Sequence, residues 1–532
     1  MTRRTAQGPG SAARCTAILL LLGATSLAAQ QPTLVPMPRQ LSLDEALNLA
    51  IPASDAVGLA RADIIRAEGE VKRARADVLP QLTGTASYTR TLKSQFNTGG
   101  RTVDSTATSS CNRFIGDPSL PISQRVDSLE QSVQCLSALD LSGLFSSLPF
   151  GRKNQYSFGL GFSQTLFSSG LIKGRPRAAV AGRKLARIGV TTAEAQARLD
   201  VTSTYFDAVL SDRLVAIAEL SLAQAETTLA QTGLGKQVGT QSEFELLRAQ
   251  VTRDNQRANV LKRRSDRRLA YLTLQQLLQL PLSQPLALTT TLDETPAGGI
   301  ESADSLVISE SDTAVSHRAA VEQVEEAATI QQILTNVTRW DRLPTVSLTS
   351  KYARIGYPDD GLPWNAKFVS DWTVGVNVSV PLWTSGRLSG NTLVAEASLA
   401  QARIRVSQAR DGASLDASST VERLQTALAT WAATQGTVAQ AERAYAIATL
   451  RFKEGISTQT ELNDSRLQLE QAEANRAVAA RDVQVSRARL RLLRDLPLGG
   501  TDVSQTLSTA QSGQQNIQQP AAGATGSNGF TP

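Results

Sequence analysis

Residues that build catalytic and metal sites are scarce in this chain of 532 residues. It contains one histidine, His317, and three cysteines, Cys15, Cys111 and Cys135. A structural zinc site takes about four such ligands, and a Ser-His-Asp site needs a histidine beside its nucleophile. We therefore expect no metal site, no cofactor and no enzymatic activity.

Aromatic residues and excess charge are also scarce. Aromatics make up 5% of the chain, against 41% hydrophobic and 19% charged residues, a balance that favours an elongated helical protein. The net charge is +6, and Arg3, Arg4 and Arg14 lie in a leader, which leaves 6 minus 3, or +3. Such a small excess argues against a nucleic-acid partner, and the basic run at 262–268 is interpreted as a solvated helix face.

Residues 1–29 have the order of a secretory signal peptide. Basic residues precede a short apolar run, Ala17 to Leu22, and small residues follow at Ala28 and Ala29. No later stretch is long and apolar enough for a transmembrane helix. After export, Cys111 and Cys135 would meet an oxidising compartment, so we expect a disulfide between them; two free thiols are the alternative.

The chain matches itself at an offset of 216 residues. Segment 159–170 (GLGFSQTLFSSG) matches 375–386 (GVNVSVPLWTSG), and Gly239 and Glu245 match Gly455 and Glu461. This duplication predicts a first repeat at 41–281, a linker at 282–312, a second repeat at 313–497 and a disordered polar tail at 498–532. The first repeat carries a long inserted loop at about 101–150, with a short helix near 124–138.

Each repeat has two segments with strand periodicity. Apolar residues alternate with small or polar ones over 156–162 and 372–380, and less regularly over 82–88 and 346–352. Four strands of about ten residues are long enough to cross a membrane in a β-barrel, but a bacterial barrel needs about eight or more. Several chains must then share one barrel, and three would give twelve strands.

Long proline-free stretches follow the strands in each repeat. Segments 177–280 and 382–496 are rich in Ala, Gln, Arg, Glu and Leu, which predicts two helical hairpins interrupted at 232–240 and at 453–458. Apolar residues recur at steps of three, four and seven, as at Leu424, Leu428, Trp431 and Val438, and again at Leu462, Leu469, Ala472 and Ala479. Mixed leucine and alanine seams favour a broad wall of closely packed helices.

These segments resemble the TolC-like outer-membrane efflux proteins over residues 41 to 497. The most specific segments are VGTQSEFELLRAQV at 238–251 and FKEGISTQTELNDSRLQL at 452–469, with LSLDEALNLA at 41–50 and SVPLWTSGR at 379–387. The resemblance implies a membrane protein with an all-α part and a β-barrel. It would be a homotrimer with a twelve-stranded outer-membrane barrel, four strands per chain, continued by a periplasmic α-helical barrel.

The resemblance also implies a passive exit duct, with most of each chain in the periplasm of a Gram-negative-type cell. The partners would be outer-membrane lipid, a periplasmic adaptor (membrane fusion) protein and an inner-membrane transporter, in tripartite efflux or type I secretion. Carboxylates near the hairpin ends would ring the entrance, here Glu245, Glu461 and Asp464. The hairpin tips would contact the adaptor, here Val238, Gly239, Thr240, Gly455, Ile456 and Ser457.

One feature departs from the family pattern. Relatives often latch the entrance with an arginine and a tyrosine, where this chain has Ser457 and Phe452, so other side chains such as Arg451 or Lys236 would have to hold it. Solvated surface carboxylates remain the alternative to an acidic ring. The alternative function is a soluble periplasmic coiled-coil scaffold or adaptor protein, which explains the helices but not the strands.

Overall fold

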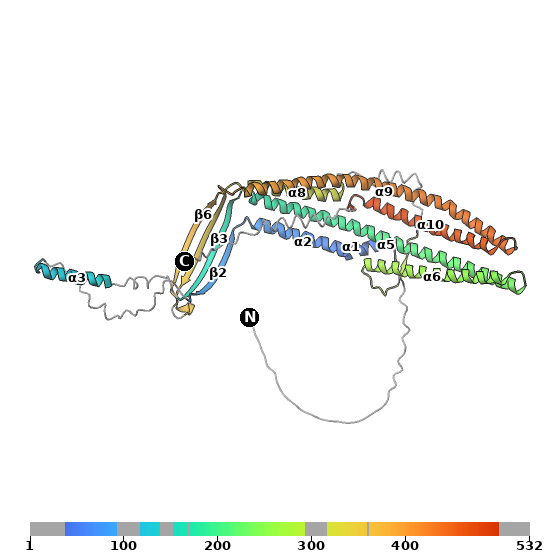
Figure 1. Ribbon diagram of the computed structural model, residues 1–532, viewed down its shortest axis with the longest axis horizontal. Helices are drawn as coiled ribbons and strands as arrows, with labels where there is room; N and C mark the ends of the chain where they lie inside the picture. The colour runs from blue at the N-terminus through green and yellow to red at the C-terminus, as the bar shows by residue number, and fades with distance from the viewer. Residues whose placement is uncertain are drawn as a thin grey trace, which may run out of the picture.

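The computed structural model describes residues 38–92, 118–138, 153–168, 170–292, 317–358 and 361–498. They form an elongated molecule in which a sheet lies toward one end and long helices run away from it (Figure 1). The predicted signal peptide, the tail beyond residue 498, Cys111 and the Cys135 side chain lie outside the described part, so the leader and the disulfide stay predictions.

Four antiparallel strands form the main sheet: β2 (Gln81–Arg90), β3 (Asn154–Ser168), β5 (Thr345–Gly356) and β6 (Phe368–Ser379). Their order is β2-β3-β5-β6, so β2 and β6 are the edges. Leu160 is opposite Tyr352, which in turn is opposite Trp372. The predicted alternation is confirmed, because these partners share one face of the sheet.

Two helical hairpins follow the strands. They consist of α5 (Leu171–Gln237) with α6 (Glu243–Leu277), and α9 (Arg387–Lys453) with α10 (Gln459–Leu492). The helices α5 and α9 have 67 residues each, or about 100 Å at 1.5 Å per residue. Both begin and end at positions 216 residues apart, the same offset as the sequence matches.

The first hairpin break is shorter than predicted. We expected it to begin at Thr232, but α5 continues through Gly233 and Gly235, and the amide of Val238 still donates to the carbonyl of Leu234 at 3.2 Å. Glycine weakens a helix by only about 1 kcal/mol, so the regular backbone bonds persist until a residue must adopt a positive φ.

The predicted apolar seams of the second hairpin are confirmed as its core. Leu424 and Leu428 of α9 pack with Val483, Leu490 and Leu493 near the end of α10, and all five are buried. Small residues such as Ala417 and Ala427 complete this cluster. Short side chains at the seam let the helices approach closely along their length.

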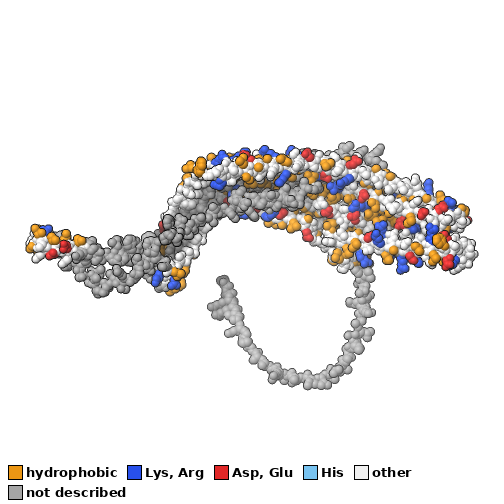
Figure 2. Space-filling view, viewed as in Figure 1, with side chains coloured by type: hydrophobic (Ala, Val, Ile, Leu, Met, Phe, Trp, Pro, Cys, Tyr) orange, Lys and Arg blue, Asp and Glu red, His pale blue; other side chains and the backbone are white. Residues whose placement is uncertain are grey.

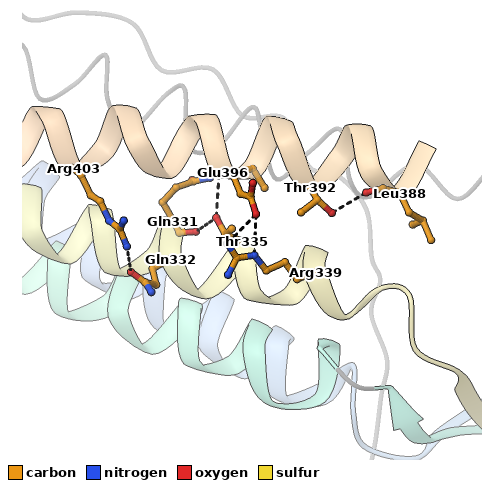
Figure 3. Close-up of polar contacts among 9 residues, drawn as sticks. Gln331, Gln332, Thr335, Arg339, Leu388, Thr392, Glu396 and Arg403 are labelled. Atoms are coloured by element: carbon orange, nitrogen blue, oxygen red, sulfur yellow. Dashed lines mark hydrogen bonds and ion pairs between the residues drawn. The ribbon is translucent and has the colours of Figure 1, made fainter. Parts of the chain in front are cut away.

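Shorter helices line the long ones. The helices α1 (Leu43–Ala53) and α2 (Asp55–Ala76) pack on α5, and α8 (Ala319–Trp340) packs on both α5 and α9. Polar contacts join α8 to α9 near the sheet, where Arg339 donates to Glu396 at 2.8 Å and Thr335 donates to the carbonyl of Ala395 at 3.1 Å (Figure 3).

The start of α5 approaches α8 so closely that only glycine fits. A Cβ at Gly174 would lie 2.1 Å from Cγ2 of Val337, and one at Gly170 would lie 2.9 Å from the Val337 carbonyl oxygen. This contact joins the two halves of the chain directly below the sheet. The matched positions in α9, Gly386 and Gly390, have no such neighbour in the chain.

Part of the predicted linker belongs to the core. Within 282–312, the strand β4 (Leu286–Leu288) pairs in parallel with β1 (Arg39–Leu41). The hydroxyl of Tyr205, which is fully buried in α5, donates to the carbonyl of Leu41 at 2.9 Å. The linker therefore begins as folded structure that fastens the start of the described chain to the middle of α5.

The predicted tail boundary is also one residue early. We assigned Leu498 to the disordered tail, but it is buried against Ala320, Val321 and Ala413. Its aliphatic side chain fills a gap between α8 and α9, which orders it.

Two smaller elements complete the described chain. The helix α3 (Ile122–Ala138) confirms the helix predicted in the inserted loop, and a short 3-10 helix, η3 (Pro363–Asn365), precedes β6. Within the described ranges, no helix has a stretch long and apolar enough to cross a lipid bilayer.

Candidate functional site

The two faces of the sheet differ in chemistry. One face is hollowed into a concavity of about 480 Å³. The strand register places short or polar residues on this face: Thr83, Thr85, Thr349, Lys351 and Thr373, with Gly159, Gly161 and Gly375; Leu160, Phe162 and Val374 also border the concavity but alternate toward the other face. The other face exposes large apolar side chains, among them Trp372, Val374, Val376 and Leu82, the last 72% exposed. A sheet with an apolar outer band and a polar hollow has the side-chain pattern of a lipid-facing channel wall.

The opposite end of the molecule consists of the two hairpin tips. Gly239 and Gly455 occupy the left-handed region, with φ of +80° and +71°. After each glycine, backbone amides return to the last helical turn: Thr240 donates to the Gly235 carbonyl at 2.9 Å, and Ile456 donates to the Arg451 carbonyl at 2.8 Å. These are the bonds of a Schellman-type helix end, in which glycine is the usual residue at the left-handed position.

The return helices begin with the same N-cap. Ser242 accepts a hydrogen bond from the amide of Glu245 at 3.2 Å, and Thr458 accepts one from the amide of Glu461 at 3.4 Å. A hydroxyl followed three residues later by glutamate is the capping-box sequence, which stabilises a helix start by about 1 kcal/mol. The glutamates predicted for the entrance thus occupy helix starts, where a negative charge is favoured.

The structure brings two of the three predicted entrance carboxylates to neighbouring positions. Gln459 is buried two residues before Glu461, and with its amide oriented so that both the nitrogen and the oxygen find partners, it donates to Glu245 Oε2 at 2.6 Å. Glu461 pairs with Arg451 at 2.9 Å. Asp464 is exposed on α10, without an ion pair to another described side chain. Gln459 therefore links the two hairpins at their tips.

The positions that depart from the family latch have local roles. Phe452 is buried with Ala448 and Leu462 inside the second hairpin. The hydroxyl of Ser457 is buried and has no hydrogen-bond partner within the described ranges. Of the alternative cations, Arg451 pairs with Glu461, and Lys236 pairs with Glu243 at 3.4 Å.

A buried polar cluster between the hairpins was missed at the sequence level. Arg466 of α10, whose side chain is 5% exposed, lies 3.5 Å from Glu470 and also bonds Ser221 of α5. Glu470 accepts from Ser221 at 2.8 Å and from Asn259 of α6 at 2.9 Å. Burial lowers the pKa of Arg466, and the Glu470 carboxylate opposes that shift. This cluster joins three helices about three to five turns from the hairpin tips.

The only sequence signal for this cluster was the four-residue spacing of Arg466 and Glu470, which is common on solvated helices. The offset-matched residues of α6 are Gln250 and Asp254, so the first repeat carries no equivalent pair. No group of three or more histidine, cysteine or carboxylate side chains suited to a metal ion occurs among the residues described.

The sequence matches a protein family over both halves. The family model described as outer membrane efflux protein matches residues 136–279 and 311–494, more than half of the chain. The chain belongs to the outer membrane efflux protein family. The resemblance to TolC-like proteins is confirmed by this match.

Solved outer-membrane proteins share its fold. VceC of Vibrio cholerae is 17% identical and superposes with a TM-score of 0.63 over 85% of this chain and 95% of its own. The CmeC channel of Campylobacter jejuni is 17% identical and superposes with a TM-score of 0.62 over 88% of this chain and 88% of its own. The open-state MtrE channel of Neisseria gonorrhoeae is 16% identical and superposes with a TM-score of 0.62 over 86% of this chain and 89% of its own. No curated protein sequence matches the chain.

The efflux protein is therefore an outer-membrane channel and not an enzyme, with a large helical part in the periplasm. The two ends of the molecule follow this division. The sheet with the apolar face belongs to the membrane end, and the hairpin tips belong to the far periplasmic end (Figure 1).

The buried cluster predicts an asymmetry between matched carboxylates. Glu470→Leu leaves the Arg466 charge buried without its partner, which should lower stability by about 3–5 kcal/mol. Asp254→Leu removes the offset-matched carboxylate, which is 60% exposed, and should change stability by no more than about 0.5 kcal/mol. The thermal midpoints of the detergent-solubilised proteins measure the difference.

A double variant, Arg466→Met with Glu470→Leu, removes both charges and should recover most of the loss. Equal midpoints for Glu470→Leu and Asp254→Leu would show that the cluster does not hold the hairpins together.

Proposed function

We propose that three copies of this chain close a twelve-stranded barrel and a continuous helical duct. The support is the pair of unpaired sheet edges, β2 and β6, on a sheet whose apolar face is exposed. In lipid, every backbone amide and carbonyl must be paired, so β6 of one copy would pair with β2 of the next.

The helices favour the same closure. Within the chain, the first half contacts the second through β3 with β5 and through α5 with α8, at Gly174 and Val337. If the chain is two repeats, the same contact would recur between α9 of one copy and α2 of the next. A Cβ at Gly390 of α9 would meet nothing within 4 Å in the single chain, which leaves room for that helix.

The proposed duct passes substrates outward from an inner-membrane transporter, through a periplasmic adaptor, in tripartite efflux or type I secretion. The alternative, a soluble periplasmic scaffold or adaptor, is disfavoured by the apolar sheet face. Val374 and Val376 are more than 60% exposed there, and an exposed apolar band of this kind needs lipid or a protein partner.

Detergent extraction of outer membranes tests the assembly. We expect the protein in the outer-membrane fraction with the native mass of a trimer, and step-like conductance in planar bilayers. Within the chain Phe162 is opposite Ser350, and the positions matched to them by the repeat are Val378 of β6 and Ala86 of β2. Because a β6–β2 pairing carries the proposal, Val378→Cys with Ala86→Cys should cross-link copies, whereas Val378→Cys alone should not. A monomer released without detergent would contradict the proposed duct and favour the alternative of a soluble periplasmic scaffold.

The entrance carboxylates are proposed to attract cations at the narrow end of the duct. Three copies of Glu245, Glu461 and Asp464 would surround one axis, and like charges at close range attract counterions strongly. The support is their place in the first two turns of the return helices α6 and α10, with Gln459 joining the two helices. Arg451 offsets one of the charges, and it is itself exposed.

Single-channel recording tests this acidic ring. In the triple variant Glu245→Gln, Glu461→Gln and Asp464→Asn, block by a divalent cation should weaken roughly five- to tenfold, since about 1 kcal/mol of attraction is lost. Asp254→Asn, an exposed carboxylate farther along α6, is the control. If a divalent cation blocks the triple variant as strongly as the wild-type channel, the three residues act only as helix caps and surface charges.

The hairpin tips are proposed to contact the adaptor. Val238 and Ile456 precede and follow the tip glycines and are 75% and 69% exposed, an unusual place for large apolar residues on a periplasmic surface. Together with Gly239, Thr240, Gly455 and Ser457 they form the two hairpin tips, each of which exposes one large apolar side chain, although Val238 is offset-matched to Glu454 and Ile456 to Thr240.

Arginine at Val238 or Ile456 should reduce efflux-dependent resistance in cells while trimers still form, because a charge would have to be desolvated against the adaptor. The conservative changes Val238→Ile and Ile456→Val should retain full resistance. Neither arginine variant strains the turn, since the glycines stay. Normal resistance in both arginine variants would exclude the tips as a docking surface.

A further inference from the structure

The inserted helix α3 lies apart from the rest of the molecule. Figure 1 shows it beyond the sheet, on the side away from the long hairpins, and it makes no extensive contact with any other described helix or strand. It is 17 residues long. It is only slightly longer than the roughly 12–15 residues below which isolated helices are marginal in water, and most helices in proteins owe their stability to packing of one face against a partner.

One face of α3 is apolar and uncovered. Ile122, Val126, Leu129 and Val133 are 78%, 47%, 47% and 56% exposed. Their spacing of four, three and four residues is the spacing of a coiled-coil seam, with Ile122 and Leu129 at d positions and Val126 and Val133 at a positions. A helix packed on a flat surface or a globular core usually has a broader apolar face than this narrow stripe.

The charges that flank the stripe fit a second copy of the same helix. In this register Arg125 is at a g position and Glu130 is at the e position that follows it. In parallel coiled coils these positions form ion pairs between helices. The Nε atom of Arg125 is buried and has no hydrogen-bond partner among the residues that the structure describes.

The polar side chains argue against a membrane-surface role for α3. The charged residues from Ile122 to Val133 are Arg125, Asp127 and Glu130, one positive and two negative, and Figure 2 shows side chains of both signs on α3. Helices that lie on lipid headgroups usually carry lysine and arginine on the polar face, which attract anionic lipid. The net charge of this face would oppose such binding.

We propose that the α3 helices of neighbouring copies pack against one another as a short parallel coiled coil above the outer mouth of the channel. The inference rests on the proposed trimer, because rotational symmetry about the duct axis makes the three helices parallel. Attachment of each helix to the barrel raises its effective concentration near the others, which compensates for its short length. Valine at a with leucine at d favours two strands in a free coil, so the attachment sets the number to three.

Disulfide cross-linking in outer membranes tests the interface, in the full chain with Cys111→Ser and Cys135→Ser as background. Leu129→Cys at a d position should form disulfide-linked dimers on oxidation at least several-fold more efficiently than Gln131→Cys at the outward f position. Arg125→Glu should reduce the Leu129→Cys product, and addition of Glu130→Arg should restore it by recreating the ion pair with the signs exchanged.

The native mass of each variant separates this proposal from the assembly on which it rests. A trimer in which Leu129→Cys cross-links no better than Gln131→Cys overturns the coiled coil and leaves the duct intact, whether the stripe then contacts lipid or its own flanking residues. A monomer overturns both. A trimer with the cross-link at position 129, dependent on Arg125 and Glu130, supports the coiled coil.

Discussion

Backbone hydrogen bonding in lipid is the constraint on which the rest of this structure depends. A membrane sheet with an open edge leaves amides and carbonyls unpaired, each at a cost of several kcal/mol. The chain supplies four strands with open edges at β2 and β6, too few to close a barrel. The proposed trimer satisfies those edges, and the paired halves of each chain then become successive segments of one wall.

The helical part depends on a different condition, which is close approach along about 100 Å of helix. Small residues at the seams meet that condition, as do the glycines that face Val337. Leucine supplies the burial, as at Leu424 and Leu493. The exceptions are polar: Gln459, which links the hairpin tips, and the Arg466 and Glu470 cluster, which joins α10 to α5 and α6. Such buried polar contacts fix the rotation of one helix against another, because a shifted helix would leave them unpaired.

The family assignment fits this division of labour. The apolar sheet face and the polar hollow behind it suit the outer membrane, and the capped, glycine-ended hairpins are at the far periplasmic end. The proposed coiled coil of α3 would add a third attachment between copies, on the outer side of the membrane. The three contacts differ in kind: backbone bonds in lipid, small-residue packing in the periplasm, and a heptad seam outside the cell.

The sequence by itself determined the strands, the long hairpins and the helix in the insertion, because each depends on local periodicity, and it determined the duplicated offset because the two repeats still share residues. Alternation along Trp372 to Val378 and three-four spacing along α9 follow from which side of an element meets solvent. The first hairpin break was placed too early at Thr232, since glycine inside a helix resembles glycine at its end until φ is known. The strand β4 in the predicted linker and the buried Leu498 at the start of the predicted tail are both part of the folded structure. Neither could be recognised in the sequence, because a three-residue strand and a single buried side chain produce no periodic pattern.

Only the tertiary structure decided which distant residues meet. Arg466 and Ser221 are hundreds of residues apart, and their contact depends on how α10 is rotated against α5. The close approach of Gly174 to Val337 depends likewise on the angle between α5 and α8. No local pattern specifies such rotations, since they result from the simultaneous packing of all the helices and from the register of the sheet above them.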